Sequence, residues 1–241
     1  MNALRRHLRR TALYLLIAYS IGVDAAAQVP IPAPPQSGPV ALIGGTIHTV
    51  TNGIIENGMI ILDAGRITAV GTDLQMPDGA IIVDVTGKHI YPGLIDAFSQ
   101  VGISEIGSVD MTVDANELGT FNPNARPNIA VNPESRHIGT SRTNGVLVTL
   151  TTPSGGLIPG LSSAMNLDGW TWEEMTLEST VALNVTWPRL TNDEEYEEVI
   201  RQLREHFAQA RSYGEAQFGG ELVASDSRYE SMLPAVSGEM P

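Results

Sequence analysis

Residues 87–100 read Gly-Lys-His-Ile-Tyr-Pro-Gly-Leu-Ile-Asp-Ala-Phe-Ser-Gln, and this stretch is the most informative in the chain. Its apolar residues from Ile90 to Ile95 predict a strand, which Pro92-Gly93 interrupts because proline cannot donate a ladder hydrogen bond. The strand runs on into polar residues. Side chains alternate between the two faces of a strand, so Phe98 and Gln100 are expected to share one face.

Short strands separated by turn residues precede this stretch. The segment Asp63-Ala64-Gly65 lies between two β-branched runs and is typical of a tight hairpin. On pattern alone, this region is a small all-β domain. Its predicted strands are Val40–Ile43, Thr46–Val50, Gly58–Leu62, Arg66–Val70 and Ala80–Asp84.

The chain after residue 100 alternates between loops, helices and one apolar strand. Residues 101–133 are rich in Gly and Pro and predict long loops. A helix is expected from Asn132-Pro133 to Thr143, followed by a buried parallel strand over Val146–Thr151. Residues 153–175 predict a loop or hairpin excursion.

Two further helices are expected near the C-terminal end. The first begins at Thr191, which forms a possible capping box with Glu194, and Glu197 and Arg201 add an i,i+4 pair. Residues 225–238 are expected to form the second. The apolar face of the first consists of Tyr196, Val199, Ile200, Leu203, Phe207 and Ala210.

The segment Pro92-Gly-Leu-Ile-Asp-Ala97 resembles the first barrel strand of the amidohydrolase superfamily. The segments 43–47 and 65–71 resemble the opening of the small β-sandwich that flanks the barrel in that family. The resemblance implies an α/β fold, namely an incomplete (β/α)8 amidohydrolase barrel preceded by part of a β-sandwich. A full barrel needs about 250 residues, so we expect barrel strands 1 and 2 and no third.

Three segments resemble a narrower group of exported bacterial amidohydrolase-family proteins. They are Gly169–Leu177 (Gly-Trp-Thr-Trp-Glu-Glu-Met-Thr-Leu), Asn132–Ser135 and Gly155–Gly160. The likeness covers roughly residues 40–241. Such proteins often have a degenerate first His-x-His.

The family's first strand ends in His-x-His, which holds a catalytic divalent metal such as zinc in complete members. In this chain Phe98 and Gln100 fill the two positions, and Ser99 projects from the opposite face. Phenylalanine has no donor atom and glutamine is a poor ligand for zinc. We therefore expect no metal ligand, no cofactor-binding residue and no assignable catalytic residue here.

Other polar residues offer weaker candidates for a site. The histidines (His7, His48, His89, His137 and His206) are expected to be surface or satisfied polar residues. Solvated loop positions are expected for Asp110, Asp114, Glu117 and Glu134, with acid–base or cation-binding roles as the alternative. The loop Pro153–Gly160 reads as a turn, with an anion cradle or substrate contact as the alternative. Ser162-Ser163 lacks triad partners, which makes a serine hydrolase improbable.

The N-terminus predicts export. Four arginines, an apolar run over residues 11–23 and Ala25-Ala26-Ala27 indicate a signal peptide over residues 1–27, with a signal anchor as the alternative. Its removal would change the formal charge from −13 to −16, which disfavours nucleic-acid binding. The chain has no cysteine, so an exported protein must be stable without disulfides.

The predicted organisation has four parts: residues 1–27 (signal peptide), 28–39 (Pro-rich linker), 40–88 (part of the β-sandwich) and 89–241 (partial barrel). Two functions remain open. The chain is either part of a hydrolase of non-peptide carbon–nitrogen bonds that is inactive by itself, or an exported non-catalytic binding module that uses its acidic loops with Trp170 and Trp172. A small-molecule substrate is expected in the first case, and no membrane contact after cleavage in either.

Overall fold

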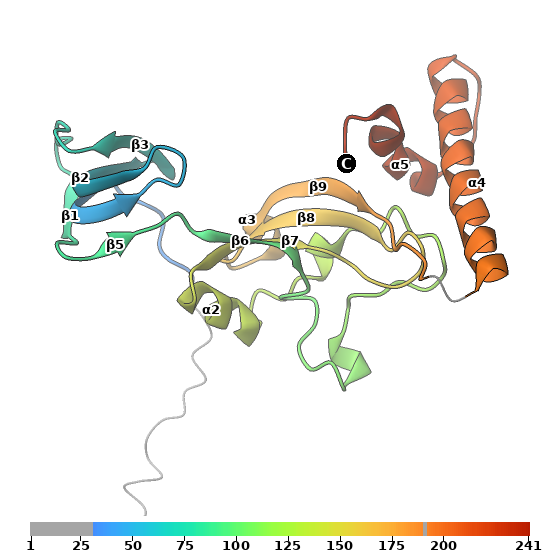
Figure 1. The fold of residues 1–241 in the computed structure, drawn as a ribbon, viewed down its shortest axis with the longest axis horizontal. Coiled ribbons are helices and arrows are strands. Elements are labelled where there is room, and N and C mark those ends of the chain that lie inside the picture. Colours follow the sequence, from blue (N-terminus) through green and yellow to red (C-terminus); the bar gives the residue numbers. More distant parts are fainter. Residues whose placement is uncertain (1–30, 190–191) are drawn as a thin grey trace, which may run out of the picture. The chain divides into compact units, whose positions relative to one another are not determined.

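The computed structural model describes residues 31–189 and 192–241 (Figure 1). The predicted signal peptide over residues 1–27 and the helix start at Thr191 lie outside the described residues. Residues 32–241 form one compact unit. Within the described ranges, no helix is both long and apolar enough to cross a membrane.

The first sheet has five strands in the part of the chain that the structure describes. Its path is β3-β2-β1-β4, and β5 pairs in parallel with β1. The predicted strands before and after Gly44-Gly45 are a single strand that carries a β-bulge at this point. A second layer of a sandwich is not present among these strands, so the sandwich stays a prediction. The strands are β1 (Val40–His48), β2 (Ile54–Asp63), β3 (Arg66–Gly71), β4 (Ile81–Asp84) and β5 (His89–Ile90).

The hairpin predicted at Asp63-Ala64-Gly65 is confirmed. Asp63 pairs with Arg66 in the antiparallel β2–β3 ladder, which leaves a two-residue turn. Both turn residues have positive φ, 48° at Ala64 and 72° at Gly65. A turn of this kind matches the right-handed twist of the two strands that it joins.

The stretch at residues 87–100 belongs to two sheets. Its first part, β5, pairs with β1, and Tyr91-Pro92-Gly93 then leads into β6 (Leu94–Ser99) of a second sheet. The predicted single strand over Ile90–Ile95 is therefore wrong in detail, because the proline marks the change from one sheet to the other. The second sheet has the order β6-β7-β8-β9.

The predicted parallel strand over Val146–Thr151 is confirmed as β7, which runs parallel to β6. It is not buried throughout. Leu147 is 46% exposed, whereas Thr149 and Thr151 are fully buried. The sheet covers the face that carries the threonines, so this strand is apolar in sequence and half-exposed in the fold.

The strands β8 (Gly160–Asn166) and β9 (Thr176–Asn184) were not predicted. Both pair antiparallel, β8 with β7 and β9 with β8, and the short helix α3 (Trp172–Met175) lies between them. The excursion predicted over residues 153–175 is thus a sheet extension that continues to residue 184. The Gly, Ser and Asn content of β8 hid it, because these residues are uncommon in strands.

Loops and one helix connect β6 to β7. The loops contain the 3₁₀ helices η1 (Asp110–Thr112) and η2 (Pro127–Ala130). The helix α2 (Arg136–Thr143) begins later than predicted, because the Ser135 side chain caps it by accepting a hydrogen bond from the main-chain N–H of His137. Asn144 ends it, as predicted.

The long helix α4 (Asp193–Phe218) and the helix α5 (Ser227–Ser237) complete the fold. Asn192 caps α4 and accepts a hydrogen bond from the Glu195 main-chain N–H at 2.8 Å, so the capping pair lies one residue beyond the predicted one. The predicted Glu197–Arg201 pair is wrong, because Arg201 bonds Glu198 and Glu205 instead.

Two apolar clusters stabilise this part of the molecule. The first packs α2, α3 and β8 around Ile103, Ile138 and Met175. The second joins α4 and α5 to β8 and β9, with Met232 at its centre. Its buried members are Ile158, Leu161, Leu183, Leu203, Ala210, Met232 and Met240.

His206 on α4 is buried beside the second cluster, which corrects its prediction as a surface or satisfied residue. Its ring stacks on Phe121 with centroids 4.3 Å apart and lies 5.5 Å from the Tyr229 ring. Its Nε2 atom is buried without a hydrogen-bond partner. Burial lowers the pKa of His206 below its ordinary value of 6.5; the Arg228 charge lowers it further, and the Asp226 charge opposes the shift.

We predict that acidification destabilises the protein partly through His206. Because its pKa is lower in the folded state, the unfolded state binds more protons from pH 6.5 down to the folded pKa, and the free energy of unfolding falls with pH over that window. Urea unfolding between pH 8 and pH 5 tests this. His206→Phe should flatten the profile, and His137→Gln, at a half-exposed site, should leave it unchanged. Identical profiles for His206→Phe and the parent would contradict the account.

Candidate functional site

The candidate site lies at the carboxyl ends of β6 and β7, the end at which parallel barrels carry their active sites. Phe98 is 70% exposed near the end of β6, whereas Ser99 is 5% exposed and faces the interior. The two side chains therefore project from opposite faces, as predicted. Neither Phe98 nor Ser99 brings a metal-binding side chain to this end of the strand.

Gln100 holds a loop in place. Its side-chain Nε2 donates to Ser154 Oγ at 3.0 Å. With the Asn116 amide turned so that its nitrogen faces Ser154, Asn116 donates to the same Oγ at 2.5 Å and to the Ser154 carbonyl at 2.9 Å. Gln100 thus connects the end of β6 to two loops, which is a structural task.

The loop Pro153–Gly160 braces the neighbouring loop. Its main-chain N–H groups at Ser154, Leu157 and Ile158 donate to the carbonyls of Ala115 and Thr120. Gly155 and Gly156 have φ of 87° and 69°, which confirms the predicted turn. Because those three N–H groups are already engaged, the geometry does not support the alternative of an anion cradle.

A pocket of about 730 Å³ opens between these loops. Two of the predicted carboxylates, Asp114 and Glu117, line it, whereas Asp110 and Glu134 lie elsewhere. All four residues are exposed, as expected of solvated loop positions. The other polar residues of the lining are Asn116, Asn122, Asn124 and Arg126. Its volume is in the range of small-molecule sites.

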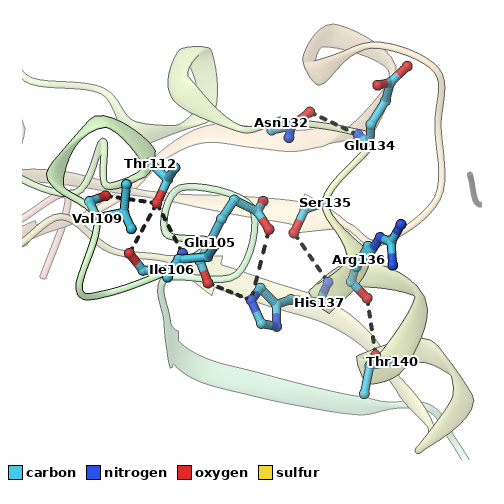
Figure 2. Close-up of polar contacts among 10 residues, drawn as sticks. All are labelled: Glu105, Ile106, Val109, Thr112, Asn132, Glu134, Ser135, Arg136, His137 and Thr140. Carbon is cyan, nitrogen blue, oxygen red and sulfur yellow. Dashed lines mark hydrogen bonds and ion pairs between the residues drawn. The ribbon is translucent and has the colours of Figure 1, made fainter. Parts of the chain in front are cut away.

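His137, at the start of α2, is a satisfied polar residue. Figure 2 shows its Nε2 atom 2.9 Å from the carbonyl oxygen of Glu105 and 3.9 Å from the Glu105 carboxylate. The other carboxylate oxygen of Glu105 is buried without a partner. The Glu134 side chain points away from this pair, and its main-chain N–H donates to Asn132. The pair lacks a third acidic or basic group.

The remaining candidates have structural roles. Ser162 donates to Asn184 Oδ1 at 2.9 Å and Ser163 to the Ser179 carbonyl at 2.8 Å, so both hydroxyls are buried and occupied within the sheet. Trp172 packs against the first apolar cluster, whereas Trp170 is 62% exposed. Among residues 31–189 and 192–241, no three His, Asp or Glu side chains are placed to hold a metal ion.

Sequence reasoning missed one contact between two predicted residues. His48 and His89 were considered separately, and the structure places their rings in contact, with 2.9 Å between His48 Nε2 and His89 Nδ1. The signal that could have revealed it is the parallel pairing of β5 with β1.

A solved structure matches most of the chain. The amidohydrolase from Thermotoga maritima MSB8 superposes with a TM-score of 0.72 at 21% identity, over 84% of this chain and 56% of that one. The fold is that of an amidohydrolase. The solved protein contains a further part that has no counterpart here.

Three curated proteins are similar over shorter segments, and no protein-family model matches the chain. An imidazolonepropionase from Geobacillus sp. is 46% identical over 50 residues, a dihydroorotase from Thermoanaerobacter sp. 30% over 95, and an adenine deaminase from Shewanella halifaxensis 30% over 101. The matches span 12%, 22% and 17% of these proteins. Together with the fold, they support a place in the amidohydrolase superfamily.

Proposed function

We propose that this chain contributes the first part of an exported amidohydrolase-family hydrolase that acts on carbon–nitrogen bonds other than peptide bonds. The fold supports this proposal, as do three relatives named imidazolonepropionase, dihydroorotase and adenine deaminase. The predicted signal peptide supports export. A small-molecule substrate follows from the proposed chemistry.

One observation carries the second half of the proposal, that residues 31–241 do not hydrolyse a substrate by themselves. At the end of β6, Phe98 has no donor atom and Gln100 is bonded to Ser154. This donor set does not fit the divalent metal that the family resemblance implies, because zinc requires imidazole, thiolate or carboxylate ligands. We therefore derive no reaction step through a metal at this position.

The pocket of about 730 Å³ favours a second candidate, an exported binding module without catalytic activity. Its carboxylates, amides and Arg126 suit a polar ligand that carries a positive charge and hydrogen-bonding groups. Trp172 contributes packing rather than ligand contact, so the predicted pair of tryptophans is reduced to Trp170.

Ligand screening by thermal shift separates the two candidates. A binding module should gain stability from cationic polar ligands, and Asp114→Asn with Glu117→Gln should remove the gain, because a ligand that binds only the folded state raises its melting temperature. The conservative pair Asp110→Asn with Glu134→Gln, outside the pocket, serves as the matched control. A ligand shift that both pairs abolish equally would contradict the pocket assignment.

A further inference from the structure

One face of the first sheet carries two histidines in contact. His48 lies at the end of β1, and His89 begins β5, which pairs in parallel with β1 through Thr46↔His89 and Ile47↔Ile90. His48 Nε2 and His89 Nδ1 are 2.9 Å apart. These two residues lie 41 positions apart in sequence.

The aromatic ring of Tyr91 fixes the orientation of the pair. It stacks on the His48 ring with centroids 4.2 Å apart and planes inclined by 11°, and lies 6.5 Å from the His89 ring. The same face carries an acidic group, because Thr46, two residues before His48, donates to the Glu56 carboxylate at 2.9 Å. A negative charge on this face favours a cation.

The separation of the two nitrogens matches two neighbouring ligands of one metal ion. Imidazole nitrogens bind at about 2.0–2.1 Å, so two of them at a right angle on one ion stand about 2.9 Å apart, and at a tetrahedral angle about 3.4 Å apart. Tetragonal coordination by nitrogen ligands is the geometry of Cu²⁺ and Ni²⁺. We propose that His48 and His89 form a two-histidine site for a tetragonal divalent ion, with Cu²⁺ as the best match.

The binding step needs no oxidant or reductant. Each neutral imidazole turns its lone pair toward the ion and keeps its proton on the other ring nitrogen, Nδ1 of His48 and Nε2 of His89. The present hydrogen bond between the rings is exchanged for two metal–nitrogen bonds, and water or Glu56 fills the other positions. Protons compete for the same lone pairs, so binding weakens in acid.

An ion at this site would clip β5 to β1. The strand β5 has two residues, and immediately after it the chain passes through Tyr91-Pro92-Gly93 into the second sheet. A chain without cysteine has no disulfide to hold such a short strand. The site lies outside the candidate active site, and the inference stands whether or not the proposed hydrolase function does.

Titration of Cu²⁺ into the chelator-treated, tag-free full chain by calorimetry tests the proposal. We expect one equivalent to bind, with an affinity that falls at least about tenfold in His48→Ala and in His89→Ala, because each variant removes one of two protein ligands. His137→Ala, which changes a half-exposed histidine on α2, should bind within about twofold of the parent. Affinity should follow the order Cu²⁺ above Ni²⁺ and Zn²⁺.

Two readouts keep the test independent of folding defects. Circular dichroism checks that each variant is folded, and Cu²⁺ should raise the melting temperature of the parent and of His137→Ala but not of His89→Ala. Electron paramagnetic resonance should detect two nitrogen ligands in the parent. Binding that neither His48→Ala nor His89→Ala weakens would indicate an adventitious ion only, and it would overturn the proposal, as would the absence of any binding to the parent.

Discussion

Met232→Ala is expected to lower the free energy of unfolding by about 2–5 kcal/mol, the usual cost of removing a large buried apolar side chain. Met232 on α5 is fully buried at the centre of the second apolar cluster, against residues from α4, β8 and β9. The truncation leaves a cavity that helices packed on a sheet close only in part. Urea unfolding followed by circular dichroism measures the loss.

Met111→Ala is the matched control, because the same substitution is made at a side chain that is 94% exposed. Its effect should stay within about 0.5 kcal/mol, as for most surface substitutions. Equal losses in the two variants would show that α5 does not pack as the structure places it.

Gly156→Ala is expected to destabilise the protein by at least about 2 kcal/mol, because it combines backbone strain with a collision. The φ of Gly156 is 69°, in the left-handed region. An added Cβ would lie 2.7 Å from the Thr120 carbonyl oxygen and 2.8 Å from that of Gly119. These atoms are main chain in the braced loops beside the pocket and cannot rotate away.

Gly53→Ala separates the two causes. Gly53 has a φ of 81° and open space where its Cβ would lie, so this variant keeps the strain without the collision. It should cost about 1–2 kcal/mol, the usual penalty for a left-handed alanine. Thermal unfolding compares the two variants. A Gly156→Ala protein as stable as Gly53→Ala would contradict the close approach of the loops.

The parts of the fold that could be predicted are those with local signals. The hairpin at Asp63-Ala64-Gly65 and the strand β7 follow from turn residues and β-branched runs, and the structure has both. The strand β8 could not be predicted, because its small polar residues are held by buried hydroxyl bonds such as Ser162 to Asn184, which no local pattern encodes. The start of α2 moved because Ser135 was the better cap.

The candidate site shows the same division. The opposite orientation of Phe98 and Ser99 follows from strand alternation and was predictable. The bonds from Gln100 to Ser154 and from His48 to His89 join residues 54 and 41 positions apart. Such contacts depend on which strands and loops the fold brings together, so sequence patterns alone do not reveal them. The burial of His206 likewise depends on Phe121, which comes from a distant loop.

The central claim is that residues 31–241 have an amidohydrolase fold without the family's metal-binding strand end, and it is tested most directly by turnover. The tag-free chain is assayed against cyclic imides and amides with Zn²⁺ or Mn²⁺ supplied, and its His48→Ala variant is assayed in parallel to remove the proposed copper site. The account predicts no hydrolysis above the uncatalysed rate in either protein. Metal-dependent turnover that persists in His48→Ala and is lost in Gln100→Ala would contradict it.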